Sequence, residues 1–271
     1  MDEKEILETM SKYTFYHTIK LTDTISTPGH TNYEAGQNIC LNAMKNIDFK
    51  GKRVLDIGCR DGLFSFAAES MGAAEIIGID NDISKAAIEF LIPFLKSKVQ
   101  MSEINVYDLT YKSFGKFDII IFPGVLYHLR YPFWALKVIR EVLNEGGYLI
   151  TETPIWRAEK KNAILFCPIE GASPYEPTSC TFFNEKGMVD TLKSIGFKTI
   201  NIEYVPVAHP IKRAIRNFKA YLRTVLARGN RPPIRRVERC AFLSQYLGVD
   251  MNSEIMKYWE DIHKIHSGGH V

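Results

Sequence analysis

Short apolar runs rich in β-branched residues alternate with longer amphipathic stretches from Lys52 onward. This alternation is typical of βαβ units that build a mostly parallel sheet. The apolar runs predict seven strands: Arg53–Ile57, Glu75–Asp80, Val99–Val106, Phe117–Phe122, Tyr148–Glu152, Thr199–Val205 and Arg239–Gln245. The amphipathic stretches predict four helices: Leu63–Met71, Ile83–Leu95, Pro132–Leu143 and Glu185–Ile195. The predicted fold class is α/β, with a doubly wound, mostly parallel seven-stranded sheet.

Three segments do not follow this alternation. The first is residues 1–50, and the second is the connection Pro154–Asn184, which is punctuated by Pro, Gly and Ser. A connection of that length in a compact domain is usually a lid or a binding loop. The third is an insertion at residues 209–233, where apolar residues at helical spacing alternate with Lys and Arg and predict a basic amphipathic helix. We expect one elaborated domain over residues 51–245, followed by a C-terminal helix and tail at residues 246–271.

The composition is that of an ordinary globular protein, since 46% of the 271 residues are hydrophobic and 24% are charged. The acidic start lacks the basic and apolar regions of a secretory signal, and no apolar run reaches membrane-spanning length. We therefore expect a cytoplasmic protein without a transmembrane segment. The five cysteines are scattered and form no CxxC pair, which favours reduced thiols over a zinc site or disulfides. No metal is predicted, and the sequence does not predict an oligomeric state.

Positive charge is concentrated in one region, although the net charge is only +3. The stretch Ile211–Cys240 holds ten Lys and Arg against the single acid Glu238. A basic patch attracts anions whatever the charge of the whole molecule. Arg213 and Arg216 are therefore candidates for binding an anionic acceptor. A solvated helix face, nucleic acid and an anionic membrane surface are the alternatives.

The strongest chemical signal is a glycine turn between a strand and a helix. Gly58 and Gly62 follow the strand Arg53–Ile57, and such a turn lets backbone N–H groups approach a polar ligand closely. The spacing does not match the GxGxxG of nicotinamide enzymes. Asp80 ends the next strand, eighteen residues beyond Gly62, where a doubly wound fold binds ribose hydroxyls.

At this turn the sequence resembles the class I S-adenosylmethionine-dependent methyltransferases, over about Lys52 to Gln245. The resemblance implies a Rossmann-like methyltransferase sheet, a lid formed by residues 1–50, S-adenosylmethionine as cofactor and S-adenosylhomocysteine as product. It implies that Asp56, Gly58 and Gly62 flank the methionine moiety, that Asp80 binds the ribose diol, and that Asp108 and Leu109 contact the adenine. Cys59, Arg60 and Asn81, which adjoin these residues, are further candidates for cofactor binding.

Arg60 stands where this family usually has a glycine. Its side chain either leans away from the cofactor or offers a cation to the cofactor's carboxylate. The departure also keeps open a non-catalytic binding protein with a methyltransferase fold.

A narrower resemblance appears in Gly124-Val125-Leu126-Tyr127-His128 and in the strand that ends with Glu152-Thr153. These stretches are similar to the branch that contains the tRNA wobble-uridine carboxymethyltransferases. That branch also holds probable methyltransferases of sugars and natural products, which often begin with an aromatic-His segment and a Thr-Pro pair. Phe15-Tyr16-His17 and Thr27-Pro28-Gly29 resemble that start, which favours a small-molecule acceptor over tRNA.

Three residues are candidates for the catalytic chemistry. Methyl transfer requires the acceptor to be positioned and, for a hydroxyl, a base to remove its proton. His128 follows a strand at the ligand-binding edge and is the first candidate base, with a structural histidine as the alternative. Glu152 on the same edge could position the acceptor or be a buried, paired carboxylate. His17 in the predicted lid is a second candidate base or a packing residue.

Aromatic side chains are the candidates for the acceptor wall, because they suit a sugar or a planar metabolite. They are Tyr16, Tyr127, Trp156 and Tyr175. Core or terminus packing is the alternative for such residues. We therefore expect an S-adenosylmethionine-dependent enzyme that O-methylates a small polar or anionic metabolite or sugar, with modification of a tRNA wobble uridine as the main alternative.

Overall fold

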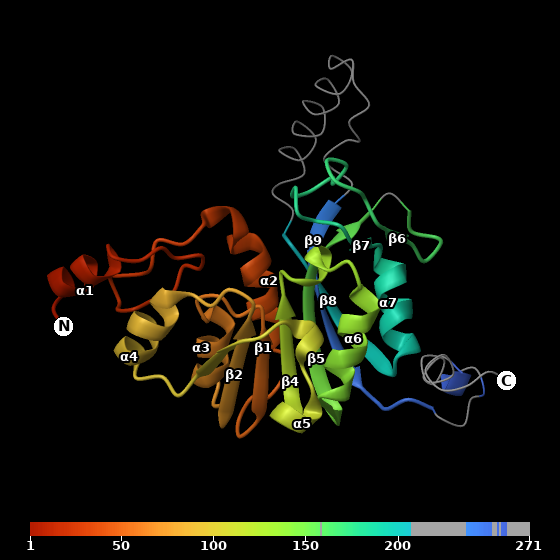
Figure 1. Cartoon of the computed structure of the whole chain (residues 1–271), viewed down its shortest axis with the longest axis horizontal. Helices are drawn as coiled ribbons and strands as arrows, with labels where there is room; N and C mark the ends of the chain where they lie inside the picture. Colours follow the sequence, from red (N-terminus) through yellow and green to blue (C-terminus); the bar gives the residue numbers. More distant parts are fainter. Residues whose placement is uncertain (158, 207–236, 251–253, 255, 259–271) are drawn as a thin grey trace, which may run out of the picture.

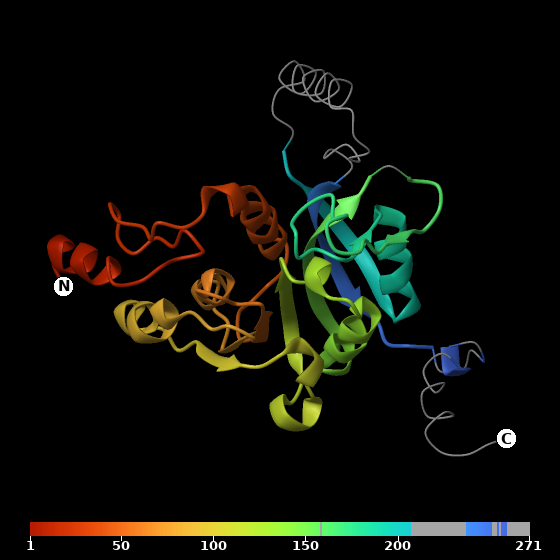
Figure 2. The ribbon, with the colours of Figure 1, turned by 45° about the horizontal axis from the view of Figure 1, so that its top comes forward.

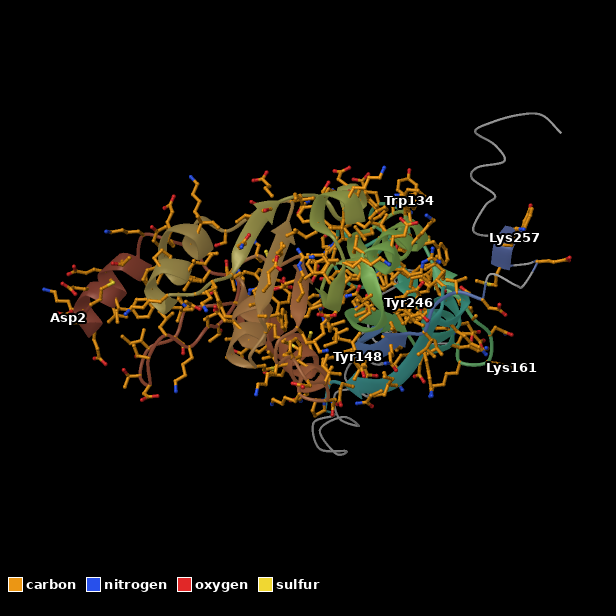
Figure 3. All side chains as sticks on the ribbon, turned by 90° about the horizontal axis from the view of Figure 1, so that it is seen from below. Asp2, Trp134, Tyr148, Lys161, Tyr246 and Lys257 are labelled. Carbon is orange, nitrogen blue, oxygen red and sulfur yellow. The ribbon has the colours of Figure 1, made fainter. Side chains whose placement is uncertain are left out.

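The computed structural model describes residues 1–157, 159–206, 237–250, 254 and 256–258. The predicted basic insertion at residues 209–233, with Arg213 and Arg216, lies outside the described residues. Most of the predicted C-terminal segment also lies outside them. Of the described residues, Asp2 near the N-terminus and Lys257 in the C-terminal segment lie at opposite ends of the molecule (Figure 3).

A seven-stranded sheet forms the centre of the molecule, in the order β3-β2-β1-β4-β5-β9-β8 (Figure 1). The strands are β1 (Arg53–Ile57), β2 (Glu75–Asp80), β3 (Gln100–Glu103), β4 (Phe117–Pro123), β5 (Leu143–Trp156), β8 (Phe197–Tyr204) and β9 (Val237–Tyr246). All neighbours pair in parallel except β9, which is antiparallel to both β5 and β8. The predicted mostly parallel sheet of seven strands is therefore confirmed.

Helices cover both faces of this sheet (Figure 1). The α-helices are α1 (Glu3–Met10), α2 (Glu34–Met44), α3 (Leu63–Ser70), α4 (Ile92–Leu95), α5 (Tyr111–Phe114), α6 (Pro132–Glu141) and α7 (Glu185–Ser194). A π-helical segment, η2 (Ala87–Leu91), runs into α4. Three 3₁₀ turns complete the described helices: η1 (Thr31–Tyr33), η3 (Val106–Asp108) and η4 (Leu126–His128).

The side-chain alternation along each strand sorts the core into two layers. Leu55 and Ile120 face α6 and α7 on one side, whereas Val54 and Ile119 face α2 and α3 on the other. Successive side chains of a strand point to opposite faces, so neighbouring apolar residues fill both layers. The continuous apolar runs in the sequence reflect burial of the strands on both sides.

The N-terminal segment packs beside η2 and α4, at the edge of the sheet formed by β3 and β2 (Figure 2). A capping box starts α1, because the Asp2 carboxylate accepts from the backbone N–H of Glu5 and the Glu5 carboxylate accepts from the backbone N–H of Asp2. Phe15 of this segment is buried against Phe90 of η2. The first thirty residues are therefore part of the folded domain.

The structure corrects three predicted elements. The strand predicted at Val99–Val106 ends at Glu103, because the Asn105 side chain accepts from the Tyr107 backbone N–H and starts η3. The helix predicted at Ile83–Leu95 contains the π-helical η2. The strand predicted at Tyr148–Glu152 continues to Trp156, and the connection after it holds β6 (Leu165–Phe166) paired with β7 (Phe182–Phe183).

Candidate functional site

A cavity of about 370 Å³ opens at the carboxyl ends of β1, β2 and β4. It lies at the edge where doubly wound sheets bind ligands. The glycine turn, the β2 terminus, the segment before η3, the turn after β4, the N-terminal segment and α2 all contribute to its wall. The lining residues are Tyr16, His17, Tyr33, Gln37, Ile57, Gly58, Arg60, Phe64, Ile79, Asp80, Asn81, Ile104, Asn105, Val106, Pro123, Gly124, Val125, His128, Leu129, Glu152 and Arg239.

The glycine turn has a left-handed backbone at three positions. The φ angles are +80° at Gly58, +47° at Arg60 and +88° at Gly62. A Cβ on Gly58 would lie 2.2 Å from Cγ2 of Val125, so this position requires glycine. The turn is held to β2 by the Gly58 backbone N–H, which donates to the Ile79 carbonyl at 2.8 Å.

The Asp80 carboxylate is placed to accept further hydrogen bonds. Its Oδ2 accepts from the Arg60 backbone N–H and its Oδ1 from the Asp82 backbone N–H, each at 3.0 Å. A carboxylate offers about four lone-pair sites, so both oxygens keep capacity for hydroxyl donors. Burial raises the pKa of Asp80 above its usual value. This geometry suits a vicinal diol such as that of ribose.

The side chain of Arg60 is engaged with Asp82. Its Nη1 donates to the Asp82 carbonyl at 2.6 Å and pairs with the Asp82 carboxylate. Of the two alternatives that the sequence left open for Arg60, this geometry matches the side chain that leans away.

Several predicted cofactor residues lie behind the cavity wall. Asp56 is fully buried, accepts from Oγ of Ser65 at 2.7 Å, and has its pKa raised to about 7 by burial. Cys59 and Gly62 also do not line the cavity. Asp80 and Asn81, by contrast, line the cavity.

The two residues that the resemblance places at the adenine are not among the residues that line the cavity. They are Asp108 and Leu109, and Leu109 is buried in the core. Ile104, Asn105 and Val106 line it instead, because the chain turns into η3 directly after β3.

Asp61 ties the N-terminal segment to the glycine turn, a role that the sequence analysis missed. Its buried Oδ2 accepts from the backbone N–H groups of Tyr16 and of His17, the latter at 2.8 Å. Nδ1 of His17 lies 3.9 Å from the same oxygen, and burial lowers the pKa of His17 to about 4. His17 and Tyr16 both line the cavity, and His17 is neutral at pH 7.

Glu152 forms a bidentate ion pair with Arg239, a second residue that the sequence analysis missed. Nε of Arg239 donates to Oε1 at 2.6 Å and Nη2 donates to Oε2 at 2.5 Å. A Cβ on Gly36 of α2 would lie 2.7 Å from Nε of Arg239, so glycine makes room for the guanidinium. Of the two roles weighed for Glu152, the geometry is that of the buried, paired carboxylate.

Tyrosines surround the Arg239 guanidinium. Its Nη1 donates to the Tyr175 hydroxyl at 2.9 Å, and its central carbon lies 5.4 Å from the ring of Tyr127. Neither tyrosine lines the cavity directly. Trp156 also lies away from it, with its ring 4.9 Å from that of Phe166. Tyr16 is thus the one predicted acceptor-wall aromatic among the lining residues.

His128 lines the cavity beside the connection that follows β5. Its Nδ1 lies 3.1 Å from Oγ1 of Thr178, and its Nε2 lies 3.6 Å from Oε2 of Glu176. Burial lowers the pKa of His128, so the imidazole is mostly neutral at pH 7. A neutral imidazole beside a carboxylate can take a proton, because the carboxylate stabilises the imidazolium that forms.

The described part of the chain offers no helix that is long and apolar enough to cross a bilayer. Within the same residues, no group of three or more His, Cys, Asp or Glu side chains is arranged to hold a metal ion.

Comparisons with known proteins agree with this geometry. Residues 30–202 match the family described as "Methyltransferase domain". A tRNA U34 carboxymethyltransferase of Nautilia profundicola is 29% identical over 198 residues, which are 70% of this chain and 65% of that protein. One of Campylobacter hominis is 39% identical over 109 residues, 40% of this chain and 38% of that protein. The chain thus spans less than two thirds of the length of either relative.

Solved structures share the fold. The N-terminal domain of EvdMO1, crystallised in the presence of S-adenosylhomocysteine and D-fucose, superposes with a TM-score of 0.60 at 16% identity, over 91% of this chain and 97% of that one. Because the family match covers well over half of the sequence and includes the glycine turn and Asp80, this chain belongs to the methyltransferase domain family, with the fold of the S-adenosylmethionine-dependent methyltransferases.

Proposed function

We propose that this chain transfers the methyl group of S-adenosylmethionine to a hydroxyl of a small polar metabolite or sugar. The observation that carries the proposal is that the N-terminal segment covers one side of the cavity. Asp61 holds Tyr16 and His17 over the glycine turn, and the Tyr16 ring stacks on Tyr33 of η1 with centroids 5.1 Å apart. A cavity of about 370 Å³ lies at the lower end of small-molecule sites.

The lining residues fit the cofactor. Asp80 keeps lone pairs for the ribose hydroxyls, and the apolar side chains of Ile79, Ile104 and Val106 suit a purine ring. When bound, S-adenosylmethionine supplies an activated methyl group on its sulfonium. The chain's own task is to bind the acceptor in line with that methyl and to keep water out.

Removal of the acceptor proton falls to His128 in this proposal. Its imidazole lines the cavity, is mostly neutral at pH 7 and has a carboxylate, that of Glu176, 3.6 Å from its Nε2. Glu152 is a poor base because both of its oxygens accept from Arg239. His17 remains the second candidate base, and its low pKa makes it the weaker one.

The test is formation of S-adenosylhomocysteine with a panel of sugars, sugar acids and hydroxylated metabolites. Turnover with any of them, dependent on His128, supports the proposal. Cofactor binding without turnover of any acceptor would favour the non-catalytic binding protein instead.

A second candidate function is carboxymethylation of a tRNA wobble uridine. The curated relatives carry that name, and the Arg239 guanidinium could contact a carboxylated cofactor. The other nine basic residues of Ile211–Cys240 could contact phosphates. Calorimetric titration with S-adenosylmethionine and with its carboxylated analogue separates the two, since a tenfold preference is about 1.4 kcal/mol. A clear preference for the carboxylated analogue, with salt-sensitive tRNA binding, would support the second candidate.

A further inference from the structure

Two buried polar atoms in the cavity wall have no hydrogen-bond partner. They are Nε2 of Gln37, whose residue is 9% exposed, and Nδ1 of His17, whose residue is 4% exposed. An unpaired buried polar atom destabilises the fold, and nearly all such atoms are paired in native proteins. Because both residues line the cavity, a ligand is the partner that would satisfy them.

The contacts of His17 place it beside the glycine turn, where the resemblance places the methionine moiety. Its ring packs edge-on against Phe64, the second residue of α3, and its backbone N–H donates to Asp61. Gln37 lines the same cavity from α2, one helical turn after Tyr33, and Tyr33 stacks on Tyr16, the neighbour of His17. The two unpaired atoms therefore belong to the part of the wall formed by the N-terminal segment and α2.

The arginines in the cavity wall are already paired, which determines what a ligand would meet at Gln37 and His17. Each of the two arginines that line the cavity is already paired with a carboxylate, Arg60 with Asp82 and Arg239 with Glu152. A ligand carboxylate beside the turn would therefore meet the neutral N–H₂ donor of Gln37. A ligand ammonium would meet a neutral imidazole with the Asp61 carboxylate 3.9 Å behind it.

We propose that Gln37 and His17 bind the amino-acid end of the cofactor. The Gln37 amide donates to the methionine carboxylate, and Nδ1 of His17 accepts from the methionine ammonium. This inference rests on the proposed function, because it assumes that the cavity binds S-adenosylmethionine.

The experiment compares two ligands that differ only at this end. S-adenosylhomocysteine carries the zwitterionic amino acid, whereas 5′-methylthioadenosine keeps the adenosine and the thioether without it. Calorimetry is run on the wild type, on Gln37→Met, which keeps the side-chain length, and on Gln245→Met as the matched control on β9. A lost hydrogen bond to a charged group should weaken S-adenosylhomocysteine about tenfold to a hundredfold in Gln37→Met and leave 5′-methylthioadenosine within about twofold.

Each other outcome overturns the inference in a recognisable way. Equal weakening of both ligands shows a structural role for Gln37, and no change in either shows that its amide serves another ligand such as the acceptor. If the wild type does not bind S-adenosylhomocysteine, the proposed function fails together with the inference. If Gln37→Met does not fold, Gln37→Glu carries the test, since its added carboxylate should weaken S-adenosylhomocysteine at least as strongly and spare 5′-methylthioadenosine.

Discussion

Replacing Arg239 with Met should destabilise the fold by about 3–5 kcal/mol, because it leaves a buried carboxylate without its partner. Glu152 is only 1% exposed, and both of its oxygens accept from the guanidinium. Arg60, the other arginine among the lining residues, is paired with Asp82 and is not available as a substitute partner. The same physics predicts that Arg239→Met/Glu152→Leu is more stable than Arg239→Met, because apolar residues often replace a buried ion pair at little cost.

The destabilisation should also depend on pH in a defined direction. Without Arg239, the buried carboxylate of Glu152 would have lost its counter-charge, whereas a neutral carboxyl would not be penalised in this way. The free-energy cost of the substitution therefore belongs to the charged form and is smaller at low pH. The difference between wild type and Arg239→Met should therefore be larger at pH 8 than at pH 5.

Urea unfolding followed by circular dichroism measures these differences. The control is Lys186→Met, which removes an exposed i,i+4 pair with Asp190 and should cost less than about 1 kcal/mol. The reasoning is refuted if Arg239→Met costs no more than this control, or if the double variant is no more stable than Arg239→Met.

Three further perturbations test the site. Asp80→Ala should weaken S-adenosylmethionine at least about tenfold by calorimetry, through lost hydrogen bonds to the ribose diol, and an unchanged affinity would remove this assignment. His128→Gln should lower kcat about 10²- to 10⁴-fold with an unchanged cofactor Kd, whereas an unchanged kcat would show a structural histidine. Asp56, with its pKa raised to about 7, should make the cofactor-free protein lose stability as pH rises from about 4 to 7, because ionisation of the folded-state carboxyl is disfavoured by burial. The urea midpoints at pH 5 and pH 8 should differ less in Asp56→Asn than in the wild type. An equal difference in the two proteins would contradict the assignment of this pH dependence to Asp56.

The predicted strand bounds were correct where a continuous apolar run defines the strand. They were wrong where pairing with a strand distant in the sequence determines where the strand ends. The bounds of β1 and β2 agree with the prediction because both are continuous buried runs. The prediction ended β5 at Glu152 because Pro154 follows. Beyond Glu152, however, β5 pairs with β9 alone, since its pairing with β4 ends at Pro123 and Glu152. A proline is tolerated where one side of a strand has no partner.

The site residues also fall into those that a local sequence pattern reveals and those that depend on distant contacts. The glycine turn and Asp80 could be found because strand, turn and next strand are contiguous in the sequence. Arg239 meets Glu152 across 87 residues, through an antiparallel register that no local pattern encodes. Gln37 lies on α2, in a segment without the βα alternation that guided the prediction. Asp61 lies within the glycine turn, but its role could not be predicted because its partners are backbone N–H groups, which any residue type provides.

The antiparallel pairing of β8 with β9 has an evolutionary consequence. Tyr204 near the end of β8 pairs with Cys240 near the start of β9, so the chain leaves and re-enters the sheet at adjacent points. Both points lie at the edge that carries Glu152 and Arg239. The connection between these two strands can therefore change in length and sequence without altering the register of the sheet, so selection can vary this part of the chain independently of the strands that carry the cavity.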